Sequence, residues 1–149
     1  MRLPSDILVV DTNILIGIAA GRKTADGGWA LVKVSAKRSL VISSDTVREA
    51  VGLCDRVDIL KPAGPNLVKL IGNLTVVDQS RYASLAQDAA RTLRDAVPSR
   101  NASTSDAHIL AVAWLYDADI WSHDRDFAGT GWPSWSSANL IAALAAEKD

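Results

Sequence analysis

The stretch Ile7-Leu8-Val9-Val10-Asp11-Thr12-Asn13 decides the fold of this 149-residue chain. Four apolar residues in succession, without polar alternation, predict a strand that is buried on both faces, as in a parallel sheet covered by helices. Asp11 then lies at the carboxyl end of that strand, the edge of an open α/β sheet where ligands bind. A carboxylate at the end of a core strand carries a desolvation cost unless its charge is compensated. We therefore expect Asp11 to have a partner.

The rest of the chain alternates between strand-like and helical segments. Apolar runs predict further short strands at residues 40–43, 74–77, 119–122 and 132–136. Residues 14–20 are predicted to form a short helix or turn, and helical spacing predicts helices at residues 29–38, 46–53, 66–71, 82–97, 106–115 and 138–146. The cluster at residues 61–65, with two prolines and a glycine, predicts a loop. This order indicates one domain over residues 1–149: a three-layer α/β/α sandwich around a central, mainly parallel sheet of four to five strands.

Composition narrows the class of protein. A net charge of −1 argues against a broad basic surface that binds nucleic acid through phosphates alone, although a local basic rim remains compatible with it. The single cysteine, Cys54, excludes an internal disulfide or a zinc cage and fits a reducing, cytoplasmic setting, with Cys54 buried. No apolar run approaches the ~20 residues of a membrane span, and the N-terminal residues lack a secretory pattern, so we expect no membrane association.

Four acidic residues occupy comparable places in the predicted fold. Asp11 ends the first strand, Glu49 lies in the first turns of the helix after the second strand, Asp106 begins an apolar helix, and Asp124 follows the fourth strand. Two unit charges ~4 Å apart repel by roughly 4 kcal/mol at an effective dielectric of ~20, so converging carboxylates need a cation. Oxygen ligands suit Mg²⁺ or Mn²⁺, and a pair of such ions can activate water for phosphodiester cleavage.

Each acid also has a purely structural interpretation. Asp106 alone is a common helix cap, Glu49 alone a solvated helix charge, and Asp124 and Asp126 alone are turn formers. Their joint placement at one rim favours a site. His108 lies two positions after Asp106, about 200° around a helix, and is therefore predicted to face away from that acid.

At this point the residues resemble a known family. Residues 9–13, Ser43 with Glu49, residues 105–111 and residues 122–127 look like successive signature blocks of the PIN-domain nucleases, most closely the VapC-type toxins of bacterial toxin–antitoxin pairs. The resemblance implies a PIN-like fold and a Mg²⁺- or Mn²⁺-dependent endoribonuclease for single-stranded RNA. It also implies an antitoxin protein as partner and a homodimer. Ser122 stands where threonine is usual in the family, and the hydroxyl is kept.

Carried over by matched position, the resemblance assigns roles to the acids and their neighbours. Asp11 and Asp124 would be the main metal ligands, with Asp106 a ligand directly or through water. Glu49 would hold a second ion or the attacking water. Supporting hydrogen bonds would come from Thr12, Asn13 and Ser122. Asp126 is a lesser candidate, since the first acid of the family's Asp-x-Asp block usually has the main role.

Further residues are candidates for contact with the substrate. Four cationic residues in loops near the predicted rim are candidates for phosphate contact: Arg22, Lys23, Arg100 and Arg125. Trp132 and Trp135 could stack on bases, but core or dimer packing is the simpler interpretation. A non-enzymatic RNA-binding or protein-interaction domain of the same fold is the alternative function, and the retained set of four acids argues against it. Another α/β phosphohydrolase would need the Gly-rich phosphate loop that this sequence lacks.

Overall fold

The structure, a computed structural model, describes residues 2–21, 28–96, 104–123 and 127–147. Its centre is a five-stranded sheet in the order β3-β2-β1-β4-β5, in which all neighbouring strands are parallel. The strands are β1 (Ile7–Val10), β2 (Ser39–Ser43), β3 (Thr75–Val77), β4 (Asp119–Trp121) and β5 (Ser134–Trp135). The first strand lies in the middle of the sheet, as its unbroken apolar run predicted.

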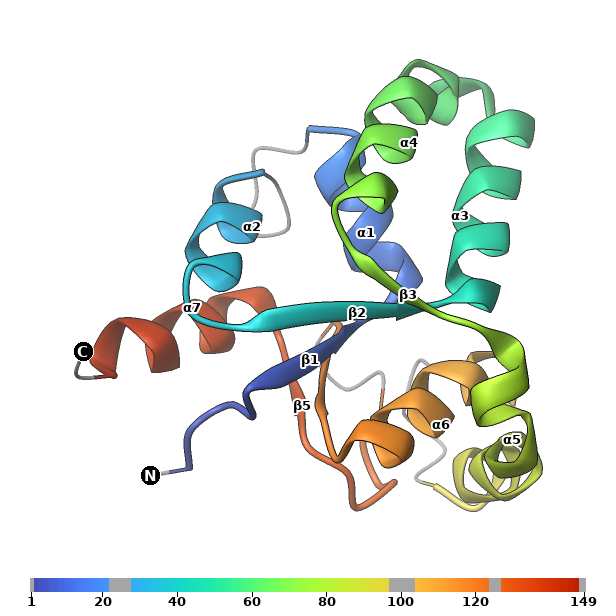
Figure 1. Ribbon diagram of the computed structural model, residues 1–149, viewed down its shortest axis with the longest axis vertical. Helices are drawn as coiled ribbons and strands as arrows, with labels where there is room; N and C mark the ends of the chain where they lie inside the picture. The colour runs from blue at the N-terminus through green and yellow to red at the C-terminus, as the bar shows by residue number, and fades with distance from the viewer. Residues whose placement is uncertain (1, 22–27, 97–103, 124–126, 148–149) are drawn as a thin grey trace.

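Helices cover both faces of the sheet (Figure 1). One layer holds α1 (Thr12–Ala19), α2 (Gly28–Ser35), α3 (Ser44–Arg56), α4 (Gly64–Gly72) and α7 (Ser137–Ala146), and the opposite layer holds α5 (Gln79–Arg94) and α6 (Ala107–Tyr116). This arrangement confirms the predicted three-layer α/β/α sandwich. Among the described residues, none of the helices combines the length and the apolar character needed to cross a membrane.

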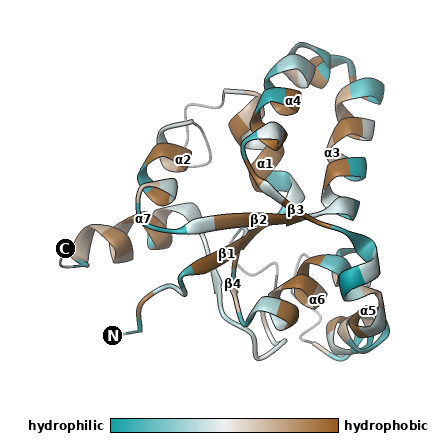
Figure 2. Ribbon diagram, in the orientation of Figure 1, coloured by the Kyte–Doolittle hydropathy of each residue, from teal (hydrophilic) through white to brown (hydrophobic). Residues whose placement is uncertain are grey.

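The two cores explain why the central strands are apolar throughout. Leu8 and Val10 belong to the core beneath α1 and α3, whereas Val9 between them belongs to the core beneath α5 and α6. Successive side chains of a strand point to opposite faces, so a central strand that is covered on both sides needs apolar residues at every position. Figure 2 shows this as mainly brown strands between the helices, some of which, such as α3 and α4, carry both brown and teal residues. Cys54 is buried in the first core, as predicted.

The structure corrects two expectations about element boundaries. The cluster at residues 61–65 is not a loop: the short 3-10 helix η1 (Asp58–Ala63) runs through Pro62, and α4 begins at Gly64 with Pro65 in its first turn. Proline is tolerated at the start of a helix because its missing N–H has no intrahelical partner there. Helix α5 begins at Gln79 rather than at residue 82, because the Asp78 side chain caps it, and it ends at Arg94, before Pro98 is reached.

The buried carboxylate of Asp119, the first residue of β4, binds the amino-terminal segment of the chain to the sheet. Asp119, which is 2% exposed, accepts hydrogen bonds from Arg2 Nη2 (3.0 Å), the Ser5 backbone N–H (3.2 Å) and Trp135 Nε1 (2.8 Å). Trp132 Nε1 donates to the Ala118 carbonyl at 2.7 Å. Both indoles pack against the cores, which confirms the packing interpretation of these two tryptophans.

Candidate metal centre

The carboxyl ends of three neighbouring strands place buried polar groups at one rim of the sheet. Asp11 follows β1, Ser43 ends β2 and Ser122 follows β4, and all three are buried. The Asp11 N–H donates to the Trp121 carbonyl at 3.0 Å, and the Asp11 carbonyl accepts from the Leu15 N–H at 3.1 Å. The backbone of Asp11 is therefore held between β4 and the first turn of α1, so its position at the rim is fixed.

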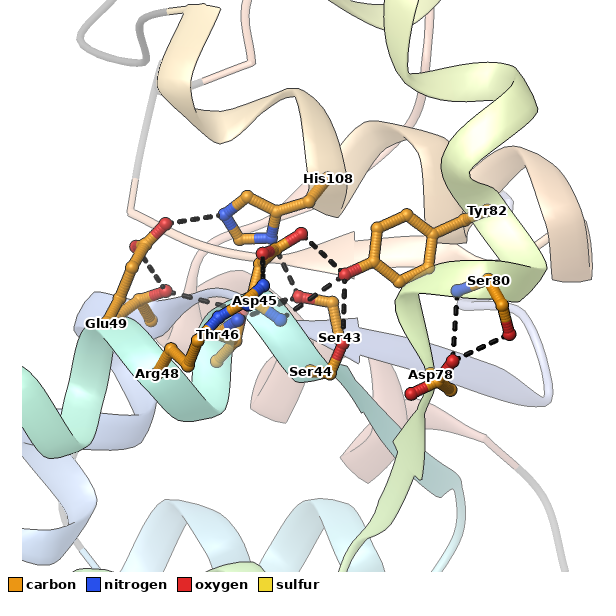
Figure 3. A network of polar contacts seen from close by, with 11 residues as sticks. Ser43, Ser44, Asp45, Thr46, Arg48, Glu49, Asp78, Ser80, Tyr82 and His108 are labelled. Atoms are coloured by element: carbon orange, nitrogen blue, oxygen red, sulfur yellow. Dashed lines mark hydrogen bonds and ion pairs between the residues drawn. The ribbon is translucent and has the colours of Figure 1, made fainter.

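Five side chains at this rim form a closed ring of polar contacts. His108 Nδ1 lies 2.7 Å from Ser43 Oγ, which lies 3.1 Å from Thr46 Oγ1, which lies 3.3 Å from Thr12 Oγ1. Thr12 Oγ1 donates to Glu49 Oε2 at 3.1 Å, and Glu49 Oε1 lies 2.8 Å from His108 Nε2. Figure 3 shows the His108 ring between Ser43 and Glu49. Residues of α1, β2, α3 and α6 thus fix the Glu49 carboxylate from two sides.

The helix start at Ser43 explains how α3 brings Glu49 to the rim. Ser43 Oγ accepts from the Thr46 N–H at 2.9 Å, a side-chain cap that satisfies one of the unpaired amides of the first turn. Glu49 follows one turn later, where its side chain leans back toward the strand end. The sequence predicted this placement of Glu49.

Glu49, Asp106 and His108 form the Glu–Asp–His cluster, in which one potential ligand atom from each residue lies within 4.8 Å of the others. The prediction that His108 faces away from Asp106 is therefore wrong. Asp106 is the last residue of the 3-10 helix η2 (Thr104–Asp106) and the N-cap of α6, with φ of −92° and ψ of 9°. A rotation of 100° per residue applies only inside an α-helix, and Asp106 lies outside it.

Electrostatics keep Glu49 in its charged form. Partial burial acts to raise the pKa of Glu49, but the hydrogen bond and electrostatic interaction with His108 and the hydrogen bond from Thr12 act in the opposite direction. The nearby Asp45 carboxylate adds a smaller upward contribution. The balance places the pKa of Glu49 below its ordinary value, so Glu49 is a carboxylate at neutral pH and can ligate a cation.

A pocket of about 330 Å³ opens beside the cluster. Its lining includes Glu49, His108, Asp45 and Tyr82. The Tyr82 hydroxyl donates to Asp45 Oδ2 at 2.6 Å, which joins α5 to the first turn of α3 (Figure 3). The sequence indicated Tyr82 only as an apolar helix position, because its hydroxyl partner lies 37 residues away along the chain.

The donor set fits a divalent cation, because two carboxylates and one imidazole are established ligand types for such ions. Asp11 lies at the same rim beside Thr12, although it is not a member of the Glu–Asp–His cluster within the described part of the chain. Asp124 lies outside the described residues. The structure thus brings Glu49 and Asp106 together, and the convergence of all four acids stays a prediction.

The other predicted site residues do not belong to the Glu–Asp–His cluster within the described part of the chain. Asn13 is exposed in the first turn of α1, and Ser122 is buried, with its hydroxyl donating to the His123 carbonyl at 3.2 Å. The supporting candidate Asp126 and the four predicted phosphate contacts lie outside the described residues: Arg22, Lys23, Arg100 and Arg125.

Comparison with known proteins identifies the family. The family model described as the PIN domain matches residues 9–145, so the chain belongs to the PIN-domain family. This confirms the resemblance seen in the signature blocks. A search of curated proteins found no match.

Solved structures show a fold shared with VapC-type proteins. A chain in the structure of VapBC2 from Rickettsia felis, bound to a DNA fragment from its promoter, has a TM-score of 0.70 and 16% sequence identity, covering 87% of this chain and 98% of that chain. VapC20 from Mycobacterium tuberculosis, a toxin that cleaves the sarcin–ricin loop, has a TM-score of 0.62 and 18% identity, covering 84% and 95%. A chain of VapBC-1 from nontypeable Haemophilus influenzae has a TM-score of 0.64 and 20% sequence identity, covering 89% of this chain and 98% of that chain.

Proposed function

We propose that this PIN-domain protein is a Mg²⁺- or Mn²⁺-dependent endoribonuclease that cleaves single-stranded RNA. The observation that carries the proposal is the Glu–Asp–His cluster, formed at the same carboxyl rim of the sheet where the buried Asp11 follows β1. A domain that only binds RNA needs cationic groups for the phosphates and gains nothing from converging carboxylates, which repel them.

Each acid has a proposed role at this rim. Asp11 and Asp124 hold the principal ion, Asp106 contributes directly or through water, and Glu49 holds a second ion or orients the attacking water. When bound, the ions supply Lewis acidity that activates water and stabilises the leaving oxygen. The Thr12 hydroxyl donates to Glu49 Oε2 at 3.1 Å and so holds the Glu49 carboxylate in its place in the cluster.

The surrounding residues complete the proposed site. Asn13 supports the acids by hydrogen bonds, and Ser122 supports them indirectly, through its hydrogen bond to the carbonyl of His123, the residue before Asp124. Asp126 is a lesser candidate for the acidic set. Loop cations hold the RNA phosphates, which position the backbone without reading its sequence. These cations are the four predicted from the sequence: Arg22, Lys23, Arg100 and Arg125.

We further propose that the nuclease is a homodimeric, cytoplasmic toxin that an antitoxin protein neutralises. The support is the fold that it shares with VapC20, a toxin, and with chains of VapBC structures. Induced expression of the chain alone should then arrest growth of a bacterial host, and coexpression of the product of a small adjacent gene should relieve the arrest. Growth unaffected by an active nuclease would contradict the toxin assignment and leave the enzymatic one standing.

The decisive test compares three proteins on one single-stranded RNA with Mg²⁺, with Mn²⁺ and with EDTA. The wild type should cleave with a divalent ion and lose activity in EDTA, and Asp11→Asn should lose at least about 100-fold, since loss of a ligand exceeds the cost of losing an outer-shell partner. Asp88→Asn is the matched control, because Asp88 is an exposed carboxylate that pairs with Arg91 on α5. RNA binding without cleavage by the wild type would favour the non-enzymatic alternative.

A further inference from the structure

His108 is the member of the Glu–Asp–His cluster that the proposed mechanism leaves without a role. Its side chain is 7% exposed, and its Nε2 points at the Glu49 carboxylate from 2.8 Å. A nitrogen donor changes the chemistry of the cluster, because Mg²⁺ is a hard ion that is bound by oxygen ligands, whereas transition-metal ions also accept imidazole. Of the two ions considered, Mn²⁺ belongs to the transition-metal series, at its weakly binding end.

The contacts around His108 are satisfied without an ion by one arrangement of hydrogens. His108 Nε2–H then donates to Glu49 Oε1, and Nδ1 accepts from Ser43 Oγ–H at 2.7 Å. Ser43 Oγ also accepts from the Thr46 N–H. Among the described residues, no buried polar side-chain atom lacks a partner, which agrees with this arrangement.

The same heavy atoms permit a second arrangement with the same number of protons. His108 Nδ1–H donates to Ser43, Ser43 to Thr46, Thr46 to Thr12, and Thr12 to Glu49 Oε2, so that all the hydroxyls donate in one direction along the ring. The Nε2 lone pair then faces the Glu49 carboxylate, an arrangement that is repulsive unless a cation binds both. An Nδ1–H fixed by an outer partner is the usual support of a histidine that ligates a metal through its other nitrogen.

The spacing also suits a shared ion. Two adjacent ligands on an octahedral ion with bonds of ~2.1 Å lie about 3 Å apart. Nε2 and Oε1 lie 2.8 Å apart, and an Asp106 carboxylate oxygen completes the group within 4.8 Å.

We propose that His108 Nε2 is a direct ligand of the second ion, which Glu49 holds, with Asp106 as a further ligand directly or through water, and that this site consequently prefers Mn²⁺ to Mg²⁺. The proposal rests on the proposed metal-dependent function and adds a nitrogen ligand to its acidic set. Ser43 is then the positioning residue that sets the histidine tautomer. The competing interpretation is that His108 only orients Glu49 through a hydrogen bond, and the two differ in whether nitrogen contacts the ion.

Pulsed electron paramagnetic resonance on Mn²⁺ distinguishes these interpretations directly. Mn²⁺ is added to the untagged, metal-free protein, and hyperfine coupling to ¹⁴N reports imidazole bound to the ion. The chain has two histidines, so His123→Gln is the matched control for His108→Gln. We expect the ¹⁴N coupling in the wild type and in His123→Gln but not in His108→Gln. Mn²⁺ affinity should fall at least about 100-fold in His108→Gln, since loss of a direct ligand exceeds the cost of losing an outer-shell partner, and Mg²⁺ affinity, measured by competition, should fall less.

Each contrary outcome is informative. Bound Mn²⁺ without ¹⁴N coupling, or with coupling that disappears only in His123→Gln, overturns the role of His108 and leaves the proposed nuclease intact. Failure of the wild type to bind Mn²⁺ overturns this proposal, and failure to bind either Mn²⁺ or Mg²⁺ overturns the proposed metal-dependent function as well. If His108→Gln does not fold, as judged by circular dichroism, the comparison of the wild type with His123→Gln still decides the question.

Discussion

Ser43 joins the fold to the candidate site, so replacing it tests both at once. Its hydroxyl caps α3 by accepting from the Thr46 N–H and also contacts His108 Nδ1 at 2.7 Å, and the residue is fully buried. In Ser43→Ala, loss of the cap costs about 1 kcal/mol of the free energy of unfolding. A buried Nδ1 left without a partner costs about 1–3 kcal/mol more. The expected total is about 2–4 kcal/mol.

A second helix cap provides the matched control. Ser136 Oγ accepts from the Asn139 N–H at 3.2 Å and caps α7, and this contact lies in an exposed setting. Ser136→Ala should therefore cost only the capping contribution of about 1 kcal/mol. Urea unfolding followed by tryptophan fluorescence and circular dichroism gives both values, and unchanged m-values show that the variants differ only in stability. The difference between the two variants isolates the contact with His108.

The result that refutes this reasoning is a cost of Ser43→Ala no larger than that of Ser136→Ala. The closed ring would then contribute nothing to stability at its Ser43–His108 contact. In thermal unfolding the expected loss corresponds to a Tm about 4–16 °C lower, since each kcal/mol shifts Tm by about 2–4 °C in a chain of this length.

Two further predictions concern groups outside the cluster. Tyr82→Phe removes the hydroxyl that donates to Asp45 and should cost about 1–2 kcal/mol. Burial, together with the hydrogen bond to Asp45, raises the pKa of Tyr82. The protonated phenol therefore stabilises the folded state fully below the unfolded pKa of ~10. This stabilisation is lost as pH rises through the higher pKa of the folded state. Tyr82→Phe should therefore flatten the alkaline loss of stability in urea unfolding from about pH 8 to 11, and an unchanged slope would contradict it. Asp119→Ala leaves Ser5 and Trp135 without their acceptor and should cost about 3 kcal/mol with RNA cleavage unchanged, whereas Asp119→Asn keeps an acceptor oxygen and should cost less. Equal losses for these two variants would count against the acceptor role.

The central strands were predictable because burial on both faces requires an unbroken run of apolar residues, which is visible in the sequence. Leu8, Val9 and Val10 need apolar side chains whichever core they face, so the run marks the strand without any knowledge of its neighbours. No comparable sequence pattern predicts the burial and hydrogen bonding of the Asp119 carboxylate. Its donors at Arg2 and Ser5 are 117 and 114 residues away, and only the completed sheet brings them together.

The acids of the candidate site were predictable for a topological reason. Parallel strands end at one rim, and the first turns of the following helices rise from it, so Asp11 and Glu49 could be placed there from the order of elements alone. Of the ring that fixes Glu49, only the supporting role of Thr12 was expected, by resemblance. The contacts of Ser43 and Thr46 were not predictable, because they are set by how α1 packs beside α3.

The missed partnership of Asp106 and His108 shows where periodicity arguments fail. The angle of about 200° between positions i and i+2 holds when both residues have helical backbone angles. Asp106 is an N-cap, so its side chain leaves the chain in a direction set by the preceding 3-10 turn, and His108 occupies the first turn of α6. First-turn side chains lean toward the amino-terminal end of their helix, and so toward the cap. An acid that directly precedes a helix and a histidine two positions later therefore belong to one candidate site, and the tautomer of that histidine decides whether the site binds its ion through oxygen alone.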